Sequence, residues 1–275
     1  MNTLFIGRWQ PLHKGHIALI GTALDKGESV VVAIRDTSRN TDNPYSVRKR
    51  KKMLRNAFGS KVKIIVVPDI KKVCIGRDVG YEVIKLPCDI EKISGTKIRK
   101  LSQTALTIWL TGLPKAGKTT LAILLKKQLK SRGLKVRVFD GDSVRKSLWG
   151  DLKFSKSDRV ENMRRVVYLC ETYNELNIIT IVALVSPYRT ARNAARTRLK
   201  NFIEVYVKCP LEICESRDKT GMYTAARSGK IRNFTGISDP YEPPGNPDVL
   251  CDTETESANE CVDKIMKVLN ERYSR

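Results

Sequence analysis

The stretch from Ile108 to Leu121 limits most strongly what this chain can fold into. It has the pattern of a buried β-strand, a glycine-containing loop and the start of a helix. Gly112, Gly117, Lys118 and Thr119 stand at the G-x-x-x-x-G-K-[ST] spacing of a P-loop. Because such a loop connects a strand to a helix, the sequence predicts a parallel α/β sheet here.

The spacing of this motif suits a nucleoside triphosphate. Glycines let backbone N–H groups approach phosphate oxygens, and the following helix presents its positive N-terminal end. Lys118 is expected to reach the β- and γ-phosphates, and the Thr119 hydroxyl to ligate Mg²⁺. The predicted triphosphate-binding residues are Gly112, Leu113, Pro114, Lys115, Ala116, Gly117, Lys118, Thr119 and Thr120.

Basic residues strongly outnumber acidic ones, with 51 Lys and Arg against 29 Asp and Glu and a formal net charge of +22. This charge suits anionic ligands, nucleotides and nucleic acids alike. No RNA-binding or zinc-knuckle motif accompanies it, so we do not expect nucleic acid as a partner. We interpret basic runs such as residues 48–52 as solvated helix faces.

The cysteines and the hydropathy pattern predict a cytoplasmic protein. The seven cysteines contain no C-x-x-C pair, which favours reduced thiols over disulfides. No signal peptide and no apolar run long enough to span a bilayer is visible, so no membrane partner is expected.

Both histidines of the chain lie near its N-terminus. The sequence pattern predicts a strand over residues 3–7 and a helix over residues 17–24. His13 and His16 lie in the turn between them. Imidazole donors at such a turn can bind negative charge that develops on a phosphate. A metal pair is the alternative, but no third ligand of the right type is close in sequence.

Two motifs in the first hundred residues resemble a known superfamily. Residues 7–16, Gly-Arg-Trp-Gln-Pro-Leu-His-Lys-Gly-His, are similar to the H-x-G-H signature of cytidylyltransferase-like nucleotidyltransferases, and residues 93–99 to their I-S-[ST]-T-x-x-R signature. The resemblance implies a Rossmann-like fold and attack on an NTP α-phosphate with release of pyrophosphate. It implies His13 and His16 as catalytic residues and, as NTP-binding residues, Gly7, Arg8, His13, His16, Ser94, Thr96 and Arg99.

The acceptor of this first domain stays open. Residues 7–16 are closer to the nicotinamide-nucleotide adenylyltransferase form, G-R-F-Q-P-x-H-x-G-H. Residues 76–78 weakly resemble part of the ATP sulfurylase motif G-R-D-H-A-G, but Val79 replaces its histidine. The predicted partners are therefore a second NTP and an unidentified acceptor, and an inactive domain is the alternative.

The chain predicts two domains joined without a flexible linker. Between the two nucleotidyltransferase motifs, strands are expected at 29–34 and 62–67, a helix at 46–58, and further apolar runs at 73–75 and 83–86. No stretch rich in Pro, Gly or Ser separates residue 99 from the P-loop strand. A boundary near Gln103 gives domains 1–102 and 103–275.

Carboxylates follow the next predicted strand of the second domain. Residues 134–139 predict a strand that leads into Asp140 and Asp142, and residues 178–185 and 202–207 predict two buried strands. Carboxylates at the end of a strand beside a P-loop can order Mg²⁺ or accept a proton from an attacking hydroxyl. Each domain is thus predicted to be α/β, a parallel sheet flanked by helices.

Residues 104–270 resemble adenylyl-sulfate (APS) kinases in many ordered motifs, including 112–120, 140–145, 154–162, 186–189 and 234–243. That family transfers the γ-phosphate of ATP to the ribose 3′-OH of adenylyl sulfate and forms PAPS. The resemblance implies ATP and adenylyl sulfate as partners, a P-loop kinase fold, and a lid at residues 221–229.

The same resemblance implies roles for particular residues. It gives Lys118, Asp140, Asp142 and Ser186 as catalytic residues, with Ser186 at a phosphoserine position, and Thr119 and Asp140 as Mg²⁺ ligands. It implies that Phe154 and Phe234 stack on the adenine of APS. The full set of APS-binding residues is Arg145, Phe154, Arg159, Asn162, Ser186, Arg189 and Phe234.

The second domain departs from its family at two sites. Pro114 and Lys115 replace the Ser-Gly pair of the usual P-loop, G-L-S-G-[SA]-G-K-[ST], and Thr220 replaces a lid lysine. These changes remove one backbone donor and weaken phosphate neutralisation, so a different nucleotidyl conjugate stays open as the substrate. We predict a bifunctional enzyme of sulfate activation, which could form a homodimer; a basic nucleotide-sensing or RNA-associated protein with degenerate sites is the rival.

Overall fold

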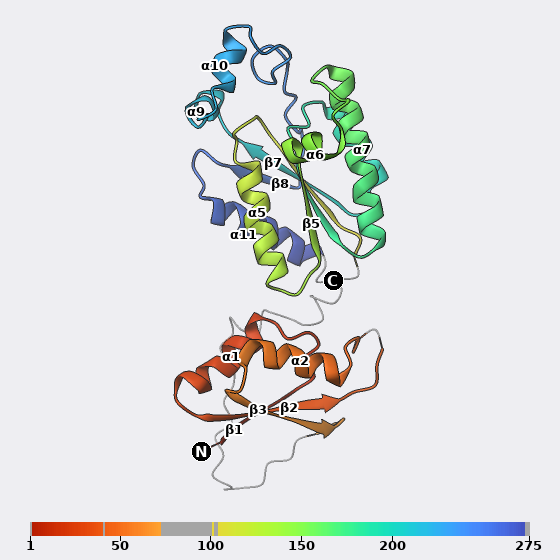
Figure 1. The fold of residues 1–275 in the computed structure, drawn as a ribbon, viewed down its shortest axis with the longest axis vertical. Helices are drawn as coiled ribbons and strands as arrows, with labels where there is room; N and C mark the ends of the chain where they lie inside the picture. Colours follow the sequence, from red (N-terminus) through yellow and green to blue (C-terminus); the bar gives the residue numbers. More distant parts are fainter. Residues whose placement is uncertain (1, 41, 73–100, 102–103, 273–275) are drawn as a thin grey trace. The chain divides into compact units, whose positions relative to one another are not determined.

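The computed structural model describes residues 2–40, 42–72, 101 and 104–272. The chain forms two compact units, with the main division along the sequence between Lys100 and Leu101, and each is described by itself (Figure 1). Predicted site residues Ser94, Thr96 and Arg99 and the apolar runs 73–75 and 83–86 lie outside the described residues.

The first unit is built on a parallel sheet of order β1–β2–β3. Its elements are β1 (Asn2–Gly7), α1 (Lys14–Asp25), β2 (Ser29–Asp36), α2 (Val47–Phe58) and β3 (Val62–Pro68). Alternate residues of β2, Val30 and Val32 among them, pack against Ile20 of α1 and Leu54 of α2. Both helices therefore cover the same face of the sheet, as Figure 1 shows.

The second unit is built on a five-stranded parallel sheet of order β5–β6–β4–β7–β8. The helices α5 and α11 pack together over one face, and α7 and α8 over the other (Figure 1). Its elements are β4 (Thr107–Thr111), α5 (Lys118–Lys130), β5 (Val136–Asp140), α6 (Gly141–Leu148), α7 (Lys156–Glu175), β6 (Ile179–Ala183), α8 (Arg189–Arg198), β7 (Phe202–Lys208), α9 (Leu211–Ser216), α10 (Met222–Arg227), β8 (Val249–Asp252) and α11 (Ala258–Arg272).

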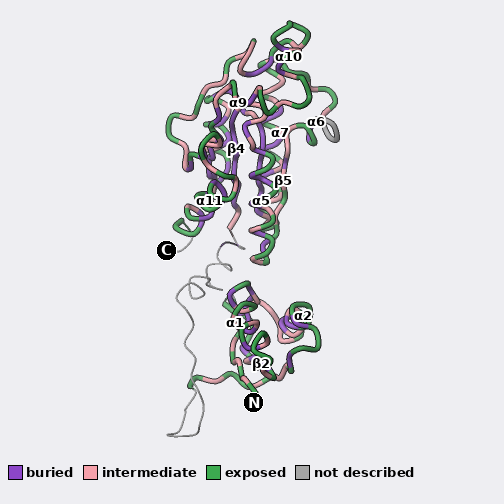
Figure 2. The backbone as a smooth tube through the Cα atoms, turned by 90° about the vertical axis from the view of Figure 1, so that its left-hand side faces the viewer, coloured by how far each residue is buried: buried purple, intermediate pink, exposed green. Residues whose placement is uncertain are grey.

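The central strand β4 is buried along its whole length (Figure 2), and so is its neighbour β6. A parallel sheet with helices on both faces requires such strands. The two units confirm the predicted α/β class, parallel sheets flanked by helices. The strand predicted over 178–185 is shorter and ends at Ala183, the last residue that pairs with β4, opposite Leu110.

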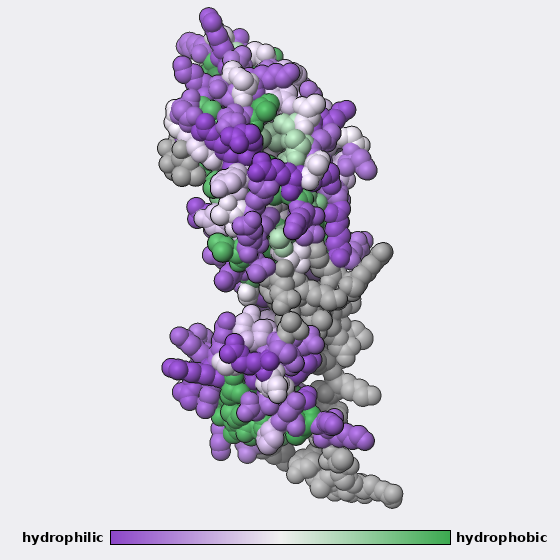
Figure 3. All heavy atoms as spheres, turned by 90° about the vertical axis from the view of Figure 1, so that its right-hand side faces the viewer, coloured by the Kyte–Doolittle hydropathy of each residue, from purple (hydrophilic) through white to green (hydrophobic). Residues whose placement is uncertain are grey.

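Hydrophilic side chains cover most of one face of each unit (Figure 3), in keeping with a chain in which charged residues make up 29% of the sequence. Among the described residues, no helix combines the length and the apolar character that a membrane span requires.

Candidate active site

The loop between β4 and α5 can be formed only with glycine at two positions. A Cβ atom at Gly112 would lie 2.3 Å from the carbonyl oxygen of Val207 on β7, so the loop lies too close to the sheet for any side chain. Gly117 has φ 100°, which L-residues rarely adopt. Both glycines of the sequence motif thus have a structural reason to be there.

Lys118 begins α5 and is buried under this loop. Its Nζ donates to the carbonyl oxygens of Gly112 at 3.0 Å and Leu113 at 2.6 Å. Burial lowers the pKa of Lys118 to about 8, and the negative charges of neighbouring groups, including Asp140 and Asp142, offset part of that effect. The ammonium is therefore still mostly protonated at neutral pH and is held by carbonyls that a phosphate could replace.

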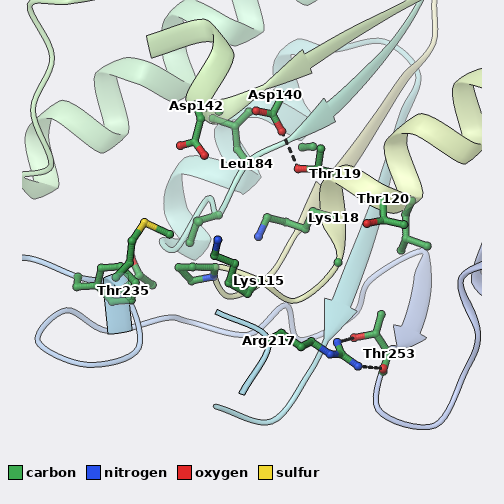
Figure 4. A pocket seen from close by; sticks show the side chains of 18 of the residues that line it. Lys115, Lys118, Thr119, Thr120, Asp140, Asp142, Leu184, Arg217, Thr235 and Thr253 are labelled. Atoms are coloured by element: carbon green, nitrogen blue, oxygen red, sulfur yellow. Dashed lines mark hydrogen bonds between the residues drawn. The ribbon is translucent and has the colours of Figure 1, made fainter. Parts of the chain in front are cut away.

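The two predicted Mg²⁺ ligands lie side by side. The Thr119 hydroxyl donates to Asp140 Oδ2 at 2.7 Å (Figure 4). Asp140 also caps α6 by accepting from the backbone N–H of Ser143 at 3.4 Å. Asp142, in the first turn of α6, is exposed. A hydroxyl and a carboxylate at one point fit Mg²⁺, which takes few protein oxygens and completes its shell with water and phosphate.

These residues line one cavity of about 960 Å³, at the upper end of the usual size of ligand sites. Its walls come from the P-loop, the start of α6, the end of β6 and the segments on either side of α10 (Figure 4). Of the predicted site residues, the cavity brings together Pro114, Lys115, Gly117, Lys118, Thr119, Thr120, Asp140, Asp142, Phe154, Arg159 and Phe234.

The two predicted aromatic residues differ in how firmly they are held. Phe154 is 52% exposed, and the guanidinium carbons of Arg145 and Arg159 lie 4.8 and 5.5 Å from the centre of its ring. Phe234 is buried and packs edge-on against Tyr223, with ring centres 4.9 Å apart. The cavity therefore has one rigid aromatic wall and one exposed ring beside two cations.

Arg145 and Arg159 lie beside Phe154 at this end of the cavity. Arg159 donates to the carbonyls of Phe154 at 3.1 Å and Asn233 at 2.6 Å. Arg145 donates to the carbonyl of Lys153 at 2.6 Å. Asn162 is buried, and its Oδ1 has no partner in the described part of the chain.

Two predicted APS-binding residues, Arg189 and Ser186, do not line the cavity. Arg189 donates to the carbonyl of Pro243 at 3.0 Å. Ser186 is buried, and its hydroxyl accepts a hydrogen bond from the Trp109 indole at 2.9 Å. Its carbonyl accepts from Arg192 at 2.6 Å. Ser186 is thus held within the fold in this conformation, with its side chain away from the cavity.

A further wall of the cavity, which no sequence motif indicated, follows β8. Thr253 donates to the P-loop carbonyl of Ala116 at 3.0 Å, and its own carbonyl accepts from Arg217 at 2.7 Å (Figure 4). Thr253 and Glu256 both line the cavity. Both residues follow β8, and ligands of open α/β sheets bind just beyond the carboxyl ends of the strands. That position alone could have indicated them as site residues.

In the first unit, the two histidines form a pair at the turn from β1 into α1. Their rings stack with centres 3.6 Å apart, and the Trp9 ring meets His16 edge-on at 4.8 Å. Burial lowers the pKa of His13 to about 4 and that of His16 to about 3. Both Nδ1 atoms are buried without a partner among the described residues. At neutral pH the site offers uncharged imidazoles.

The turn that carries the histidines is held by a buried cation. Arg50 is 1% exposed and donates to the carbonyls of Arg8 at 2.9 Å and Arg35 at 2.7 Å. The interpretation of residues 48–52 as a wholly solvated face is therefore wrong at this position. The Trp9 indole also donates to the carbonyl of Ala33 at 2.9 Å. Predicted residues Gly7 and Arg8 lie in this segment, where β1 ends.

Comparison with known proteins shows the family of the second unit. Residues 104–252, more than half of the chain, match the model of the adenylylsulphate kinase family. The chain belongs to this family. Residues 4–86 match the model of the cytidylyltransferase-like family.

Individual relatives of this kinase family match the same region. The adenylyl-sulfate kinase of Synechococcus sp. (strain JA-3-3Ab) is 48% identical over 169 residues, 62% of this chain and 96% of the relative. That of Halothermothrix orenii is 49% identical over 171 residues, 62% of this chain and 92% of the relative. The solved APS kinase of Mycobacterium tuberculosis, in complex with AMPPNP and APS, is 36% identical with a TM-score of 0.58 and covers 60% of this chain and 97% of its own.

These matches confirm the predicted family of each domain and the predicted enzyme class, an ATP-dependent kinase. The role of each site residue stays a prediction.

Proposed function

We propose that the domain of residues 103–275 transfers the γ-phosphate of ATP to the 3′-OH of adenylyl sulfate, with PAPS and ADP as products. One observation carries this proposal. A single cavity is lined both by the P-loop and by Phe154 and Phe234, so a triphosphate and the adenine of a second nucleotide fit one space. The M. tuberculosis relative is seen with an ATP analogue and APS together.

The triphosphate would bind over the P-loop. Lys118 would exchange its two carbonyl partners for β- and γ-phosphate oxygens, which are stronger acceptors because they are charged. Thr119 and Asp140 would hold Mg²⁺, which neutralises charge on the phosphates when it is bound.

The acceptor hydroxyl would lose its proton to Asp142. The 3′-oxygen bonds to the γ-phosphorus while the bond from that phosphorus to the β-γ bridging oxygen breaks, and ADP leaves with the electron pair. Asp140 is already engaged by Thr119 and Ser143, whereas Asp142 is exposed at the cavity. Direct transfer needs no phosphoserine, and the Ser186 hydroxyl is buried against Trp109.

Adenylyl sulfate would bind at the aromatic end of the cavity. Phe154 and Phe234 would stack on the adenine, since aromatic side chains bind base faces favourably. Arg145 and Arg159, both beside Phe154, would pair with the phosphosulfate. Asn162 would supply a further polar contact.

The test is ATP turnover by the purified protein with Mg²⁺ and candidate acceptors. Formation of ADP only when APS is present, with PAPS identified by mass spectrometry, is the expected result. Turnover with another nucleotidyl conjugate and none with APS would contradict the proposal and favour the alternative substrate. Lys118→Ala serves as the inactive control.

For residues 1–102 we propose nucleotidyl transfer from an NTP to an acceptor, with release of pyrophosphate. The stacked pair His13 and His16 at the end of β1 carries this second proposal. As neutral donors, the imidazoles would bind charge that grows on the α-phosphate as the acceptor oxygen attacks. Pyrophosphate release would be scored for each NTP with a panel of acceptors, and equal release by His13→Ala would contradict the assignment.

A further inference from the structure

Lys115 has an unusual backbone conformation in the P-loop. Its φ is 61°, in the left-handed region that side chains disfavour. A lysine is kept in such a strained conformation only when its surroundings hold it there. Figure 4 shows that its side chain extends into the cavity, as does that of Lys118.

The Lys115 ammonium is held by a carboxylate from another part of the chain. Its Nζ lies 3.3 Å from Asp218 Oδ1, and the side chain of Asp218 is only 2% exposed. The same carboxylate accepts from Thr220 N at 3.1 Å, from Thr220 Oγ1 at 2.5 Å and from Tyr223 N at 2.9 Å. Asp218 is therefore fixed by its own loop and fixes the position of Lys115 in turn.

A second contact connects the same two segments. The Tyr223 hydroxyl donates to the carbonyl of Pro114 at 2.9 Å, and Tyr223 is buried against Phe234. The P-loop is thus bonded at two adjacent residues to the segment before and within α10. These bonds keep Lys115 at the cavity wall without filling the cavity.

We propose that Lys115 is a second phosphate-binding lysine of this P-loop, and that Asp218 is its positioning residue. This inference rests on the proposed function of the kinase domain. An ammonium has three N–H donors, so one can stay on Asp218 while two bind oxygens of the ATP triphosphate. Lys118, released from its two carbonyls, and Lys115, still held by Asp218, would then both bind the triphosphate.

The test is the affinity for ATP and Mg²⁺ without APS, measured by calorimetry on the full chain. Lys115→Gln is expected to raise the Kd about tenfold, as for the loss of charge-assisted hydrogen bonds, and Lys115→Arg to restore most of the affinity. Lys127→Gln, an equal loss of charge at an exposed position of α5, is the matched control and should bind like the wild type. Binding that remains in the double variant Lys115→Gln/Lys118→Ala is assigned to the first domain and is subtracted.

In the kinase reaction, Lys115→Gln should raise the KM for ATP and leave the KM for APS unchanged. Equal ATP affinity in Lys115→Gln and Lys127→Gln would overturn the inference. A protein that binds ATP through Lys115 but does not phosphorylate APS would instead contradict the proposed function alone.

The positioning role of Asp218 is tested by combining substitutions. If Asp218 acts through Lys115, Asp218→Asn should weaken ATP binding in the wild-type background and have little further effect in Lys115→Gln. An equal loss of affinity in both backgrounds would show that Asp218 acts only through the fold of its own loop, and would overturn its assignment.

Discussion

The two candidate sites are built in the same place on similar sheets but differ in their charge. Each lies at the carboxyl end of a parallel strand, in the turn that leads into a helix. In the second unit this turn carries Lys118, whose pKa of about 8 keeps it mostly protonated at neutral pH. In the first unit it carries His13 and His16, whose low pKa values keep them neutral.

The difference matches the phosphate that each site would handle. Transfer of a γ-phosphoryl group leaves charge on ADP and on the transferred group, and a fixed cation and Mg²⁺ stabilise that charge. Attack on an α-phosphate builds charge on the oxygens of that phosphate, where neutral donors can bind it without the cost of burying a charge. Similar strand ends can thus support two kinds of chemistry on triphosphates.

Removal of the P-loop cation should give the largest difference between the activities of the two sites. Lys118→Ala is expected to lower kcat/KM for phosphorylation of APS by about 10³-fold or more, because a preorganised charge on the phosphates is lost. Pyrophosphate release by the first domain should not change. Loss of both activities would show that the two sites are not independent. Assays of PAPS and pyrophosphate on the same preparation decide between these outcomes.

The reciprocal change tests the imidazole site. His13→Ala and His16→Ala should each lower pyrophosphate release about 10²-fold, the usual effect of removing one transition-state donor. Phosphorylation of APS should stay at the wild-type rate in both variants. His13→Gln, which keeps an N–H donor, should retain more activity than His13→Ala if the role is hydrogen bonding. Full pyrophosphate release in both alanine variants would show that His13 and His16 are not the catalytic residues of the first domain.

Much of both sites could be predicted from local sequence rules. Glycine spacing identified the P-loop, and the position of Asp140 at a strand end predicted its place beside Thr119, which the 2.7 Å hydrogen bond shows. These predictions need only the strand, loop and helix around the motif. The fold class was predictable for the same reason, since alternating strands and helices favour parallel sheets.

Long-range contacts could not be predicted in this way. The sequence placed Lys115 among the triphosphate-binding residues, but its partner Asp218 is more than a hundred positions away and reaches it only through the fold. Arg50 shares a helix face with Leu54 and Phe58 at spacings of four and eight residues, so its burial could have been suspected. The carbonyls that make this burial tolerable belong to Arg8, just after β1, and to Arg35 in β2, and only the fold brings them to Arg50.

The exposed aromatic ring offers a smaller effect confined to the second site. Phe154→Ala should raise the KM for APS about tenfold, since stacking on one base contributes about 1–3 kcal/mol. The KM for ATP should change little, because Phe154 is at the opposite end of the cavity from the P-loop in the proposed binding mode. Phe154→Tyr should restore the KM for APS. An unchanged KM in Phe154→Ala would leave Phe234 as the adenine-binding residue.

The pH dependence gives the smallest effect but compares both sites in one experiment. Free Lys118 loses its proton above about pH 8, and ATP binding must restore it, so the Kd for ATP should rise toward about tenfold per pH unit above that value. Below about pH 8 the Kd should be nearly constant, since the ammonium is already formed. His13 and His16 are neutral throughout this range, so pyrophosphate release should show no histidine-dependent change between about pH 6 and 9. A Kd for ATP that stays constant to about pH 10 would mean that Lys118 keeps the usual pKa of an exposed lysine, and that the contrast between the two sites lies in their shape and not in their protonation.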